Sequence, residues 1–303
     1  MKRKMIWILG ILAAGTVVLL IASCSYNTHA RRVLHERLET APREPGTNIL
    51  AGAAPVNIDH DRERVCVLLH GFMSSPADYG RLPEALEEAG WDVRVPLHPG
   101  HGRDPRRLRD IEADDLIEAA EEELLTLRKR YETVALGGFS MGGSIAIILA
   151  ARHKPDATLL VNPFLRNPYH LKYILPLRWW HTLLSPLLDY GKHPGTIPIN
   201  RPEGKDGFVI YHVVPAPIFA ELFELADRAG QTDLPDVPVL ALLSEGDVTA
   251  SAHAARKYLH RTGGEKTQIK TYDRSNHVLM LDYDREEATR DIIGFLEDAA
   301  ANQ

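Results

Sequence analysis

The sequence predicts an α/β fold in which a mostly parallel sheet carries helices on both faces. Apolar runs of strand length alternate with longer helical stretches, which is typical of parallel sheets. A serine flanked by glycines also stands between one such strand and the helix that follows it. The strand candidates are 65–69, 133–137, 157–163, 238–243 and 267–272, and the helix candidates are 77–90, 114–131, 143–154, 251–261 and 284–299.

The serine lies in the pentapeptide Gly138-Phe139-Ser140-Met141-Gly142, a G-x-S-x-G pattern. A strand before such a turn and a helix after it place the serine at the tip of the sheet, in strained geometry. The flanking glycines fit this interpretation because a side chain at either position would collide with its neighbours. The alternative is a tight turn with an idle serine, but the strand and the helix favour Ser140 as a nucleophile.

A serine nucleophile needs a base and an orienting acid, and after this kind of turn the acid precedes the histidine in the chain. Asp247 lies in the turn after one strand candidate, and His277 lies in the loop after the next. Glu245, on the same turn as Asp247, is a competing acid. Taken singly, Asp247 could cap the following helix and His277 could face solvent. Together, and in this order, they predict a triad of Ser140, Asp247 and His277.

The apolar run 65–69 ends in His70-Gly71-Phe72. Here the chain resembles the α/β-hydrolase family, in which the loop after a His-Gly pair donates a backbone N–H to the substrate oxyanion. The resemblance implies an oxyanion hole formed by the N–H groups of Phe72 and Met141, and the serine turn itself orients the amide of Met141. We interpret His70 as a hydrogen-bonding brace of this loop rather than as a base or metal ligand.

The segment 93–102 strengthens this resemblance, because it is similar to the strand and Gly-His-Gly loop of the carboxylesterase and monoacylglycerol lipase branch. Its histidines, His98 and His101, have no third ligand at a fitting spacing, and the sequence has no H-E-x-x-H motif, so no metal is expected. No cofactor is expected either. Matching motifs cover residues 63–163 and 235–298, and they imply the α/β-hydrolase fold with an inserted cap.

The alternation of strands and helices breaks between residues 164 and 234, where prolines and aromatic residues gather. This segment resembles the cap of α/β hydrolases, so we assign 61–163 and 235–303 to the core and 164–234 to the cap insertion. We expect a short hairpin strand at 208–211. The cap aromatics, most of them expected to form the cap's own core and a few to line an acyl pocket, are Tyr169, Tyr173, Trp179, Trp180, Phe208, Tyr211, Phe219 and Phe223.

The composition is that of an ordinary globular protein. A chain of 303 residues with 45% hydrophobic and 25% charged residues is long enough for one α/β domain with an insertion. A net charge of -6 and a pI near 6.2 argue against a nucleic-acid partner. Cys24 and Cys66 do not form a disulfide framework, and Cys66 is expected to be a small buried apolar residue. The oligomeric state is left open.

The amino terminus predicts membrane attachment. Three basic residues precede the uncharged run 5–22, whose 18 residues fit a spanning helix better than a signal-peptide core of about 7–15 residues. Residues 21–24 nevertheless resemble a bacterial lipobox, so 1–24 is either a membrane anchor or a lipoprotein signal. The leading charges predict a catalytic domain outside the cytoplasm, although three arginines between 31 and 37 oppose this orientation. Residues 25–60 are expected to form a stalk or partly helical linker.

These observations favour a membrane-attached serine hydrolase that cleaves carboxylic esters through an acyl-enzyme. The apolar cap and the membrane segment point to lipid-like acyl groups, such as those of a monoacylglycerol or lysophospholipid. Peptidases and acyltransferases use the same triad, so both stay open. The rival from another class is a catalytically idle α/β-hydrolase scaffold that acts as a membrane-bound binding protein. Such a scaffold would be expected to lack a triad residue, and this sequence retains all three.

Overall fold

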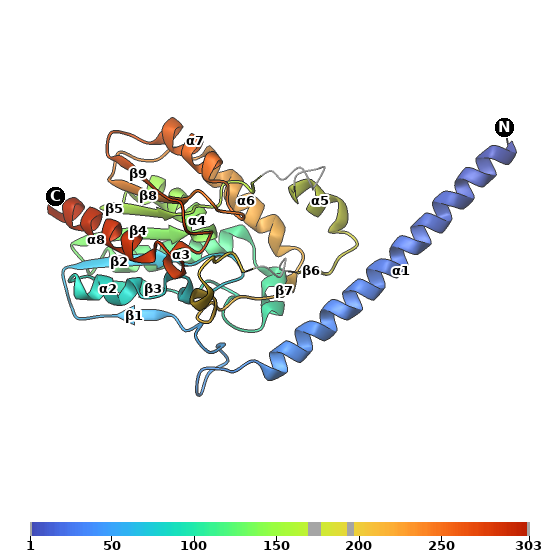
Figure 1. Ribbon diagram of the computed structural model, residues 1–303, viewed down its shortest axis with the longest axis horizontal. Helices are drawn as coiled ribbons and strands as arrows, with labels where there is room; N and C mark the ends of the chain where they lie inside the picture. Colours follow the sequence, from blue (N-terminus) through green and yellow to red (C-terminus); the bar gives the residue numbers. More distant parts are fainter. Residues whose placement is uncertain (1, 169–176, 193–196, 302–303) are drawn as a thin grey trace.

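The computed structural model describes residues 2–168, 177–192 and 197–301 and has a seven-stranded sheet at its centre (Figure 1). The edge strand β1 pairs antiparallel with β3, and the other neighbouring strands are parallel. This confirms the mostly parallel sheet predicted from the sequence. In sheet order the strands are β1 (Val56–Ile58), β3 (Asp92–Val95), β2 (Arg64–Leu69), β4 (Thr133–Phe139), β5 (Ala157–Val161), β8 (Val239–Ser244) and β9 (Thr267–Tyr272).

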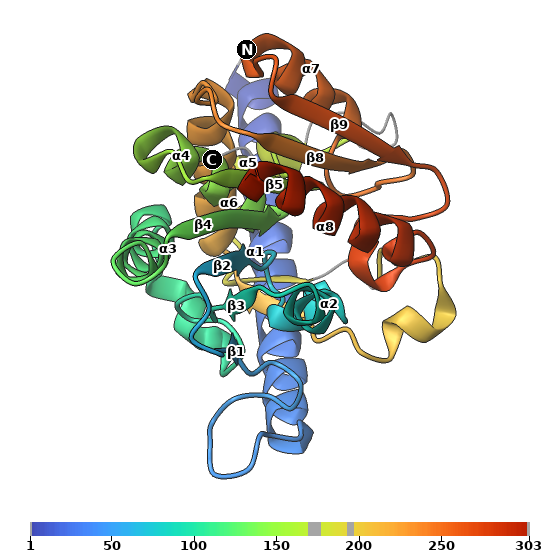
Figure 2. The same ribbon diagram turned by 90° about the vertical axis from the view of Figure 1, so that its left-hand side faces the viewer.

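Helices cover both faces of the sheet, as Figure 2 shows, so the central strands are buried on two sides. Along β2, Val65, Val67 and Leu69 point into one core cluster while Cys66 and Leu68 point into the other. The first cluster packs against α3 (Ala113–Leu127), α4 (Met141–His153), α6 (Ile218–Gln231) and α7 (Ala252–Thr262), and the second against α2 (Leu82–Glu88) and α8 (Arg285–Ala301).

The predicted helices are present, with one interruption that the sequence analysis missed. The candidate 77–90 is split into a 3₁₀ helix, Pro76–Tyr79, and α2. Gly80 separates them with a φ of 52°, a conformation that ends a right-handed helix and that glycine adopts at low cost. Further short 3₁₀ helices in the described part of the chain are Pro105–Asp110, Pro202–Lys205 and Leu279–Leu281.

The amino-terminal helix α1 (Lys2–Thr40) is much longer than the uncharged run that begins it. Its apolar portion is exposed, and its length and mean hydropathy of 2.6 would allow it to cross a membrane, as a signal sequence also would. The helix continues because no proline or glycine occurs from residue 16 until Pro42. The predicted linker 25–60 therefore consists of the second half of α1, an irregular segment and strand β1.

The insertion contains a small helix, α5 (Leu177–Leu184), and a two-stranded antiparallel sheet of β6 (Tyr190–Lys192) and β7 (Val213–Pro215). The strand predicted at 208–211 was wrong. Those residues are irregular, and the N–H of Tyr211 donates to the carbonyl of Met73 in the core (2.8 Å). Because the N–H of Tyr211 is used in this bond, it is not available to pair with a neighbouring strand.

The last part of the insertion, α6, packs on the core helices α3 and α4 rather than only on the cap. Its apolar side chains Leu222 and Leu225 lie in the same cluster as those helices. The sequence analysis did not predict α6 among the helices that cover the sheet. Pro215 and Pro217 precede it within a proline-rich stretch, which was assigned to the cap. Among the predicted cap aromatics, Tyr169 and Tyr173 lie outside the described residues.

Candidate active site

Ser140 occupies the sharp turn between β4 and α4 and has a φ of 53°. Residues with a side chain rarely adopt this conformation, so the backbone is strained at this point. A Cβ atom at position 138 would lie 2.1 Å from the carbonyl oxygen of Gly142, and one at position 142 would lie 2.0 Å from that of Leu69. Both collisions are with backbone atoms, which explains the two flanking glycines.

Of the three residues predicted as a triad, His277 lies within hydrogen-bond distance of the other two. The Nε2 atom of His277 is 2.9 Å from the Oγ atom of Ser140, and its Nδ1 atom is 2.7 Å from Oδ2 of Asp247. A carboxylate can only accept hydrogen bonds, so Nδ1 carries the proton and Nε2 presents its lone pair to the serine hydroxyl. In this tautomer the imidazole is set to take a proton from Ser140.

The carboxylate of Asp247 is held in place from its other side. Its Oδ1 atom accepts the N–H groups of Thr249 (2.7 Å) and Ala250 (2.8 Å), and its side chain is 1% exposed. The competing acid, Glu245, is exposed and forms an ion pair with Arg256 of α7. The geometry therefore favours Asp247 as the partner of the histidine.

Asn162 links the three strand ends that carry the site, and the sequence analysis did not single it out. Its Nδ2 atom donates to the carbonyl of His277 (2.7 Å) and to Oγ of Ser244 (3.0 Å), and its Oδ1 accepts the N–H of Ser244 (2.7 Å). The residue follows β5 with a φ of 42°, which asparagine tolerates better than most residues. An asparagine directly after a buried strand was the signal that could have identified it.

Two buried carboxylates fix the loop that carries His277. Oδ2 of Asp282 accepts the N–H groups of Asn276 (2.8 Å) and Asn200 (2.7 Å), which joins this loop to the insertion. Asp284 accepts the hydroxyl of Ser275 (2.8 Å). The imidazole also packs against the ring of Phe139, at a centroid distance of 4.8 Å. His277 therefore has little freedom to leave the position between Ser140 and Asp247.

The two candidate oxyanion donors lie on segments that touch each other. Met141 is the first residue of α4, where an amide has no acceptor within the helix. The segment 69–72 lies against the same turn, since a Cβ atom on Gly142 would meet the carbonyl oxygens of Leu69 and His70. The N–H groups of Phe72 and Met141 are thus on adjoining backbone segments.

Asp78 supports the loop that carries Phe72, and it too was absent from the sequence analysis. Its Oδ2 accepts the N–H of Gly71 (2.8 Å) and its Oδ1 accepts the hydroxyl of Ser74 (2.5 Å). The side chain is buried, and this burial raises the pKa of Asp78 to about 7, against the opposing effect of its two hydrogen bonds. The hydroxyl of Ser74 also lies 3.2 Å from the carbonyl of Val209, so it has a second acceptor when Asp78 is protonated.

His70, His98 and His101 form a buried group beside this loop, with ring centroids 4.3 to 6.0 Å apart. His70 shares a hydrogen bond with the carbonyl of Gly71 (2.9 Å) and accepts the N–H of His98 (3.1 Å), as a brace would. Burial lowers the pKa of His98 to about 3 and that of His101 to about 4, so both rings stay neutral. Within the described part of the chain, no group of three or more ligating side chains could hold a metal ion.

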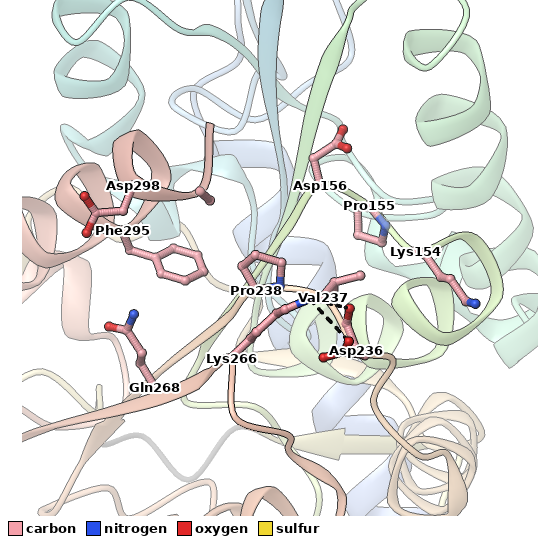
Figure 3. Close-up of a pocket in the computed structure, with 11 residues that line it drawn as sticks. Lys154, Pro155, Asp156, Asp236, Val237, Pro238, Lys266, Gln268, Phe295 and Asp298 are labelled. Carbon is pink, nitrogen blue, oxygen red and sulfur yellow. Dashed lines mark hydrogen bonds and ion pairs between the residues drawn. The ribbon is translucent and has the colours of Figure 1, made fainter. Parts of the chain in front are cut away.

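A hollow on the opposite edge of the sheet is not part of this site (Figure 3). Its lining comes from the residues just before β5, β8 and β9, from the beginning of β9 and from α8. Ser140, Asp247 and His277 instead follow the carboxyl ends of β4, β8 and β9, where open parallel sheets bind their ligands. Figure 3 also shows the ion pair between Lys266 and Asp236 (3.2 Å) at the rim of this hollow.

A serine on a strained strand-to-helix turn, facing a histidine and a carboxylate from later loops, defines the α/β-hydrolase class. A family model described as "Serine aminopeptidase, S33" matches residues 60–284, and the chain belongs to this family. The resemblance inferred from the sequence is thereby confirmed, and the chain is an α/β hydrolase of the esterase and lipase type.

Two curated relatives are similar over most of their length. A carboxylesterase of Bacillus subtilis (strain 168) is 26% identical over 239 residues, which cover 78% of this chain and 93% of the relative. A thermostable monoacylglycerol lipase of Bacillus sp. (strain H-257) is 26% identical over 246 residues, covering 78% and 91%. Both names match the branch that segment 93–102 indicated.

Solved structures confirm the fold. A metagenome-derived lipolytic enzyme superposes with a TM-score of 0.73 at 22% identity, over 82% of this chain and 99% of that one. The monoacylglycerol lipase of Paleococcus ferrophilus gives 0.68 at 20% identity, over 81% and 98%. The whole of α1 lies before the matched family region, which begins at residue 60.

The crowding at the serine turn generates a stability prediction. Gly142→Ala should destabilise the protein by about 1–3 kcal/mol or more, because the new methyl meets the immobile backbone of Leu69. Gly294→Ala is the matched control: it lies in the middle of α8 with nothing within 4 Å, and it should stabilise by about 0.5–1 kcal/mol. Urea unfolding of both variants is the measurement, and equal effects of the two would contradict the crowding.

The raised pKa of Asp78 generates a pH prediction. Between about pH 4 and pH 7 the folded carboxyl keeps its proton while the unfolded one releases it, so stability should fall as pH rises through this window. Asp78→Asn cannot titrate, and its amide mimics the protonated group. The unfolding free energy of wild type relative to Asp78→Asn should therefore decline up to about pH 7 and then level off.

The exposed carboxyl of Asp110 provides the control for this pH series. Asp110→Asn should show the wild-type slope, because its side chain makes no buried contact to a catalytic loop. Urea midpoints at four pH values from about 4.5 to 8 would resolve the difference. A difference between wild type and Asp78→Asn that stayed constant over this range would show that Asp78 is already ionised in the folded protein.

Proposed function

We propose that the chain is a membrane-attached serine hydrolase that cleaves carboxylic esters with lipid-like acyl groups. The observation that carries the proposal is the pair of hydrogen-bond distances at His277, 2.9 Å to Ser140 and 2.7 Å to Asp247. These contacts supply what nucleophilic catalysis requires, which is a hydroxyl beside a base whose other nitrogen is held by an acid. The names of the two bacterial relatives, a carboxylesterase and a monoacylglycerol lipase, support the same reaction.

In the proposed mechanism, Oγ of Ser140 attacks the acyl carbon while Nε2 of His277 takes the hydroxyl proton. The carbonyl oxygen becomes an oxyanion, which the N–H groups of Phe72 and Met141 stabilise. Collapse of this intermediate expels the alcohol, which receives the proton from the imidazolium and leaves an acyl-serine. Water then attacks the acyl-serine with the same assistance, releasing the carboxylic acid and restoring Ser140. Asp247 keeps the imidazole oriented and stabilises its charged form throughout.

The surroundings of the oxyanion loop support an apolar acyl group. The ring of Phe72 packs edge-on against Phe219 of α6, at a centroid distance of 5.3 Å. Met73 and Ile218 belong to the same apolar cluster, which joins the loop to the insertion. An acyl chain that leaves the serine toward the insertion would thus meet hydrocarbon and aromatic surface, where burial is favourable.

The presence of all three triad residues argues against an idle binding scaffold, but it does not distinguish ester hydrolysis from amide hydrolysis or acyl transfer. An idle binding scaffold would have no need for a strained serine turn or for a histidine held by Asn162 and Phe139. Amide hydrolysis and acyl transfer share the first half of the mechanism and differ in leaving group or acceptor. Comparing hydrolysis of matched acyl esters and acyl amides, with and without an added alcohol acceptor, would distinguish these reactions.

The triad assignment predicts a graded loss of activity. Ser140→Ala should abolish ester hydrolysis and labelling by a fluorophosphonate probe while leaving the fold intact. Asp247→Asn should lower kcat by about three to four decades, because the imidazole loses its anionic orienter and takes the wrong tautomer. Turnover of a soluble short-chain ester and far-ultraviolet circular dichroism are the measurements.

The controls for this prediction are Glu245→Gln and Ser251→Ala. Glu245 pairs with Arg256 at the surface, so its loss should change kcat by less than about threefold. Ser251 caps α7, and its variant should still react with the probe. If Glu245→Gln were the more damaging of the two acid variants, the acid would have to be reassigned to Glu245.

Membrane attachment predicts the behaviour of two further variants. Removing residues 1–24 should release an active, water-soluble enzyme, because the catalytic strands all begin beyond residue 55. Palmitate labelling of the full chain that disappears in Cys24→Ala would identify a lipoprotein, whereas an unlabelled protein that needs detergent for extraction would identify a spanning anchor. A full chain that stays in the aqueous fraction without detergent would contradict membrane attachment in either form.

A further inference from the structure

The second half of α1 is packed against the insertion and is not a free stalk. Nδ2 of Asn27 donates to the carbonyl of Leu187 (3.1 Å), and its Oδ1 accepts the N–H of Asp189 (3.0 Å). Arg31 forms an ion pair with the carboxylate of Asp189. The side-chain amide of Asn27 thus binds two backbone groups of the insertion. Two bonds from one planar group define both the distance between α1 and the insertion and the face that α1 turns toward it.

Apolar contacts reinforce this packing one turn further along the helix. Ala30 and Leu34 of α1 are buried together with Tyr190 of β6 and Val213 of β7. Residues 27, 30, 31 and 34 recur at helical spacing, so they form one continuous stripe on α1. The second half of α1 therefore packs against the insertion along one continuous stripe of contacts.

This contact begins at the level where the membrane segment ends. The apolar run stops at Ala22, because polar residues follow it, and the first of them, Ser23, donates its hydroxyl to the carbonyl of Leu187. Eighteen helical residues span about 27 Å, close to the hydrocarbon thickness of a bilayer. If the chain is instead cleaved and lipidated at Cys24, the lipid enters the membrane at this same level. Both forms of attachment place the membrane surface beside the segment around Leu187.

The helix α5, which ends three residues before Leu187, exposes an apolar face. Trp179 and Leu183 are 65% and 61% exposed, the highest values for large apolar side chains outside α1 in the described part of the chain. They are four residues apart and so lie on one side of the helix. In Figure 1, α5 lies on the side of the protein that faces the first half of α1. Tryptophan is enriched at the boundary between lipid headgroups and acyl chains.

We propose that the second half of α1 holds the insertion so that α5 lies in the membrane surface, with Trp179 and Leu183 inserted among the lipids. The occupant of this apolar face is the bilayer that anchors the chain, and the inference rests on the membrane attachment proposed above. Helices with one apolar face bind the interface in this orientation. The exposed side chains and the spanning run are then two parts of one contact with the same membrane.

The buried side of α5 connects this contact to the catalytic loop. The ring of His181 lies 6.0 Å from that of Phe219, which in turn lies 5.3 Å from Phe72, centroid to centroid. Phe72 carries one of the proposed oxyanion donors. Ring contacts thus connect α5, through Phe219, to the loop that borders the proposed oxyanion hole. The arrangement favours substrates held in the membrane over esters dissolved in water.

Tryptophan fluorescence tests the placement of α5 directly. The full chain is synthesised cell-free into vesicles of phosphatidylcholine and phosphatidylglycerol, with and without bromine on the acyl chains, and its intact mass is checked. The chain has four tryptophans, so the contribution of Trp179 is the difference between wild type and Trp179→Phe. Brominated lipids should quench most of this contribution. Trp7, measured with Trp7→Phe, reports on the spanning run in the same sample.

The two tryptophans separate failure of this inference from failure of membrane attachment. If Trp7 is quenched and Trp179 is not, α1 is inserted but α5 is away from the lipid, and the inference is overturned. If neither is quenched, the attachment itself is wrong. A Trp179 emission that is shielded equally in plain and brominated vesicles would indicate a second copy of the chain on this face. None of these readouts depends on ester hydrolysis.

Matched variants test the role of α1 and the consequence for turnover. Arg31→Ala combined with Asn27→Ala should reduce quenching of Trp179 but not of Trp7. The control Arg32→Ala, whose side chain pairs with Glu36, should leave both unchanged.

Trp179→Ser with Leu183→Ser should lower kcat/KM for a vesicle-borne monoacylglycerol by about tenfold or more. Its rate on a soluble short-chain ester should match wild type, as should both rates of the control Leu125→Ser. Equal loss on both substrates would overturn the proposal.

Discussion

The close backbone contact at Gly138 and Gly142, two residues before and after Ser140, is the constraint on which the rest of the site depends. The turn brings the backbone of Gly142 against the carbonyl of Leu69, so the end of β4 and the end of β2 touch at this point. This contact sets the serine, the first amides of α4 and the loop after β2 in one place. The backbone strain at Ser140 is held by the buried strand and helix around it, since both are packed on all sides.

Around this turn, single buried polar side chains hold the loops of the site in place. Asn162 ties the end of β5 to Ser244 and His277, and Asp78 ties two residues of the loop after β2. Each makes two or more hydrogen bonds, so its own burial is compensated and the backbone it holds is fixed. The distances within the proposed triad therefore depend on buried residues outside it.

The sequence predicted the parts of the fold that repeat a simple pattern. Buried parallel strands are continuous apolar runs, and the glycine-flanked serine has few alternative explanations, so the core and the order of Ser140, Asp247 and His277 could be inferred. Asn162 and Asp78 could not, because their importance lies in partners that only folding brings near. The three-residue strand β1 is too short to show a pattern, and the proline-rich insertion hid α6 and misled the strand assignment at 208–211.

The packing of α1 bears on how the α/β domain would be oriented relative to the membrane under the proposed attachment. A flexible stalk would let the active site sample every orientation above the membrane, and only the local concentration of substrate would rise. A helix fixed to the insertion by Asn27, Arg31 and Leu34 instead selects one orientation. The same insertion contacts the loop of Phe72 through Phe219, so the element that we propose to meet the lipid is also the one proposed to border the acyl group. In this proposal, the orientation of the domain on the membrane and its preference for an apolar substrate both depend on the insertion packed against the second half of α1. A change in the contact between them is expected to alter both properties.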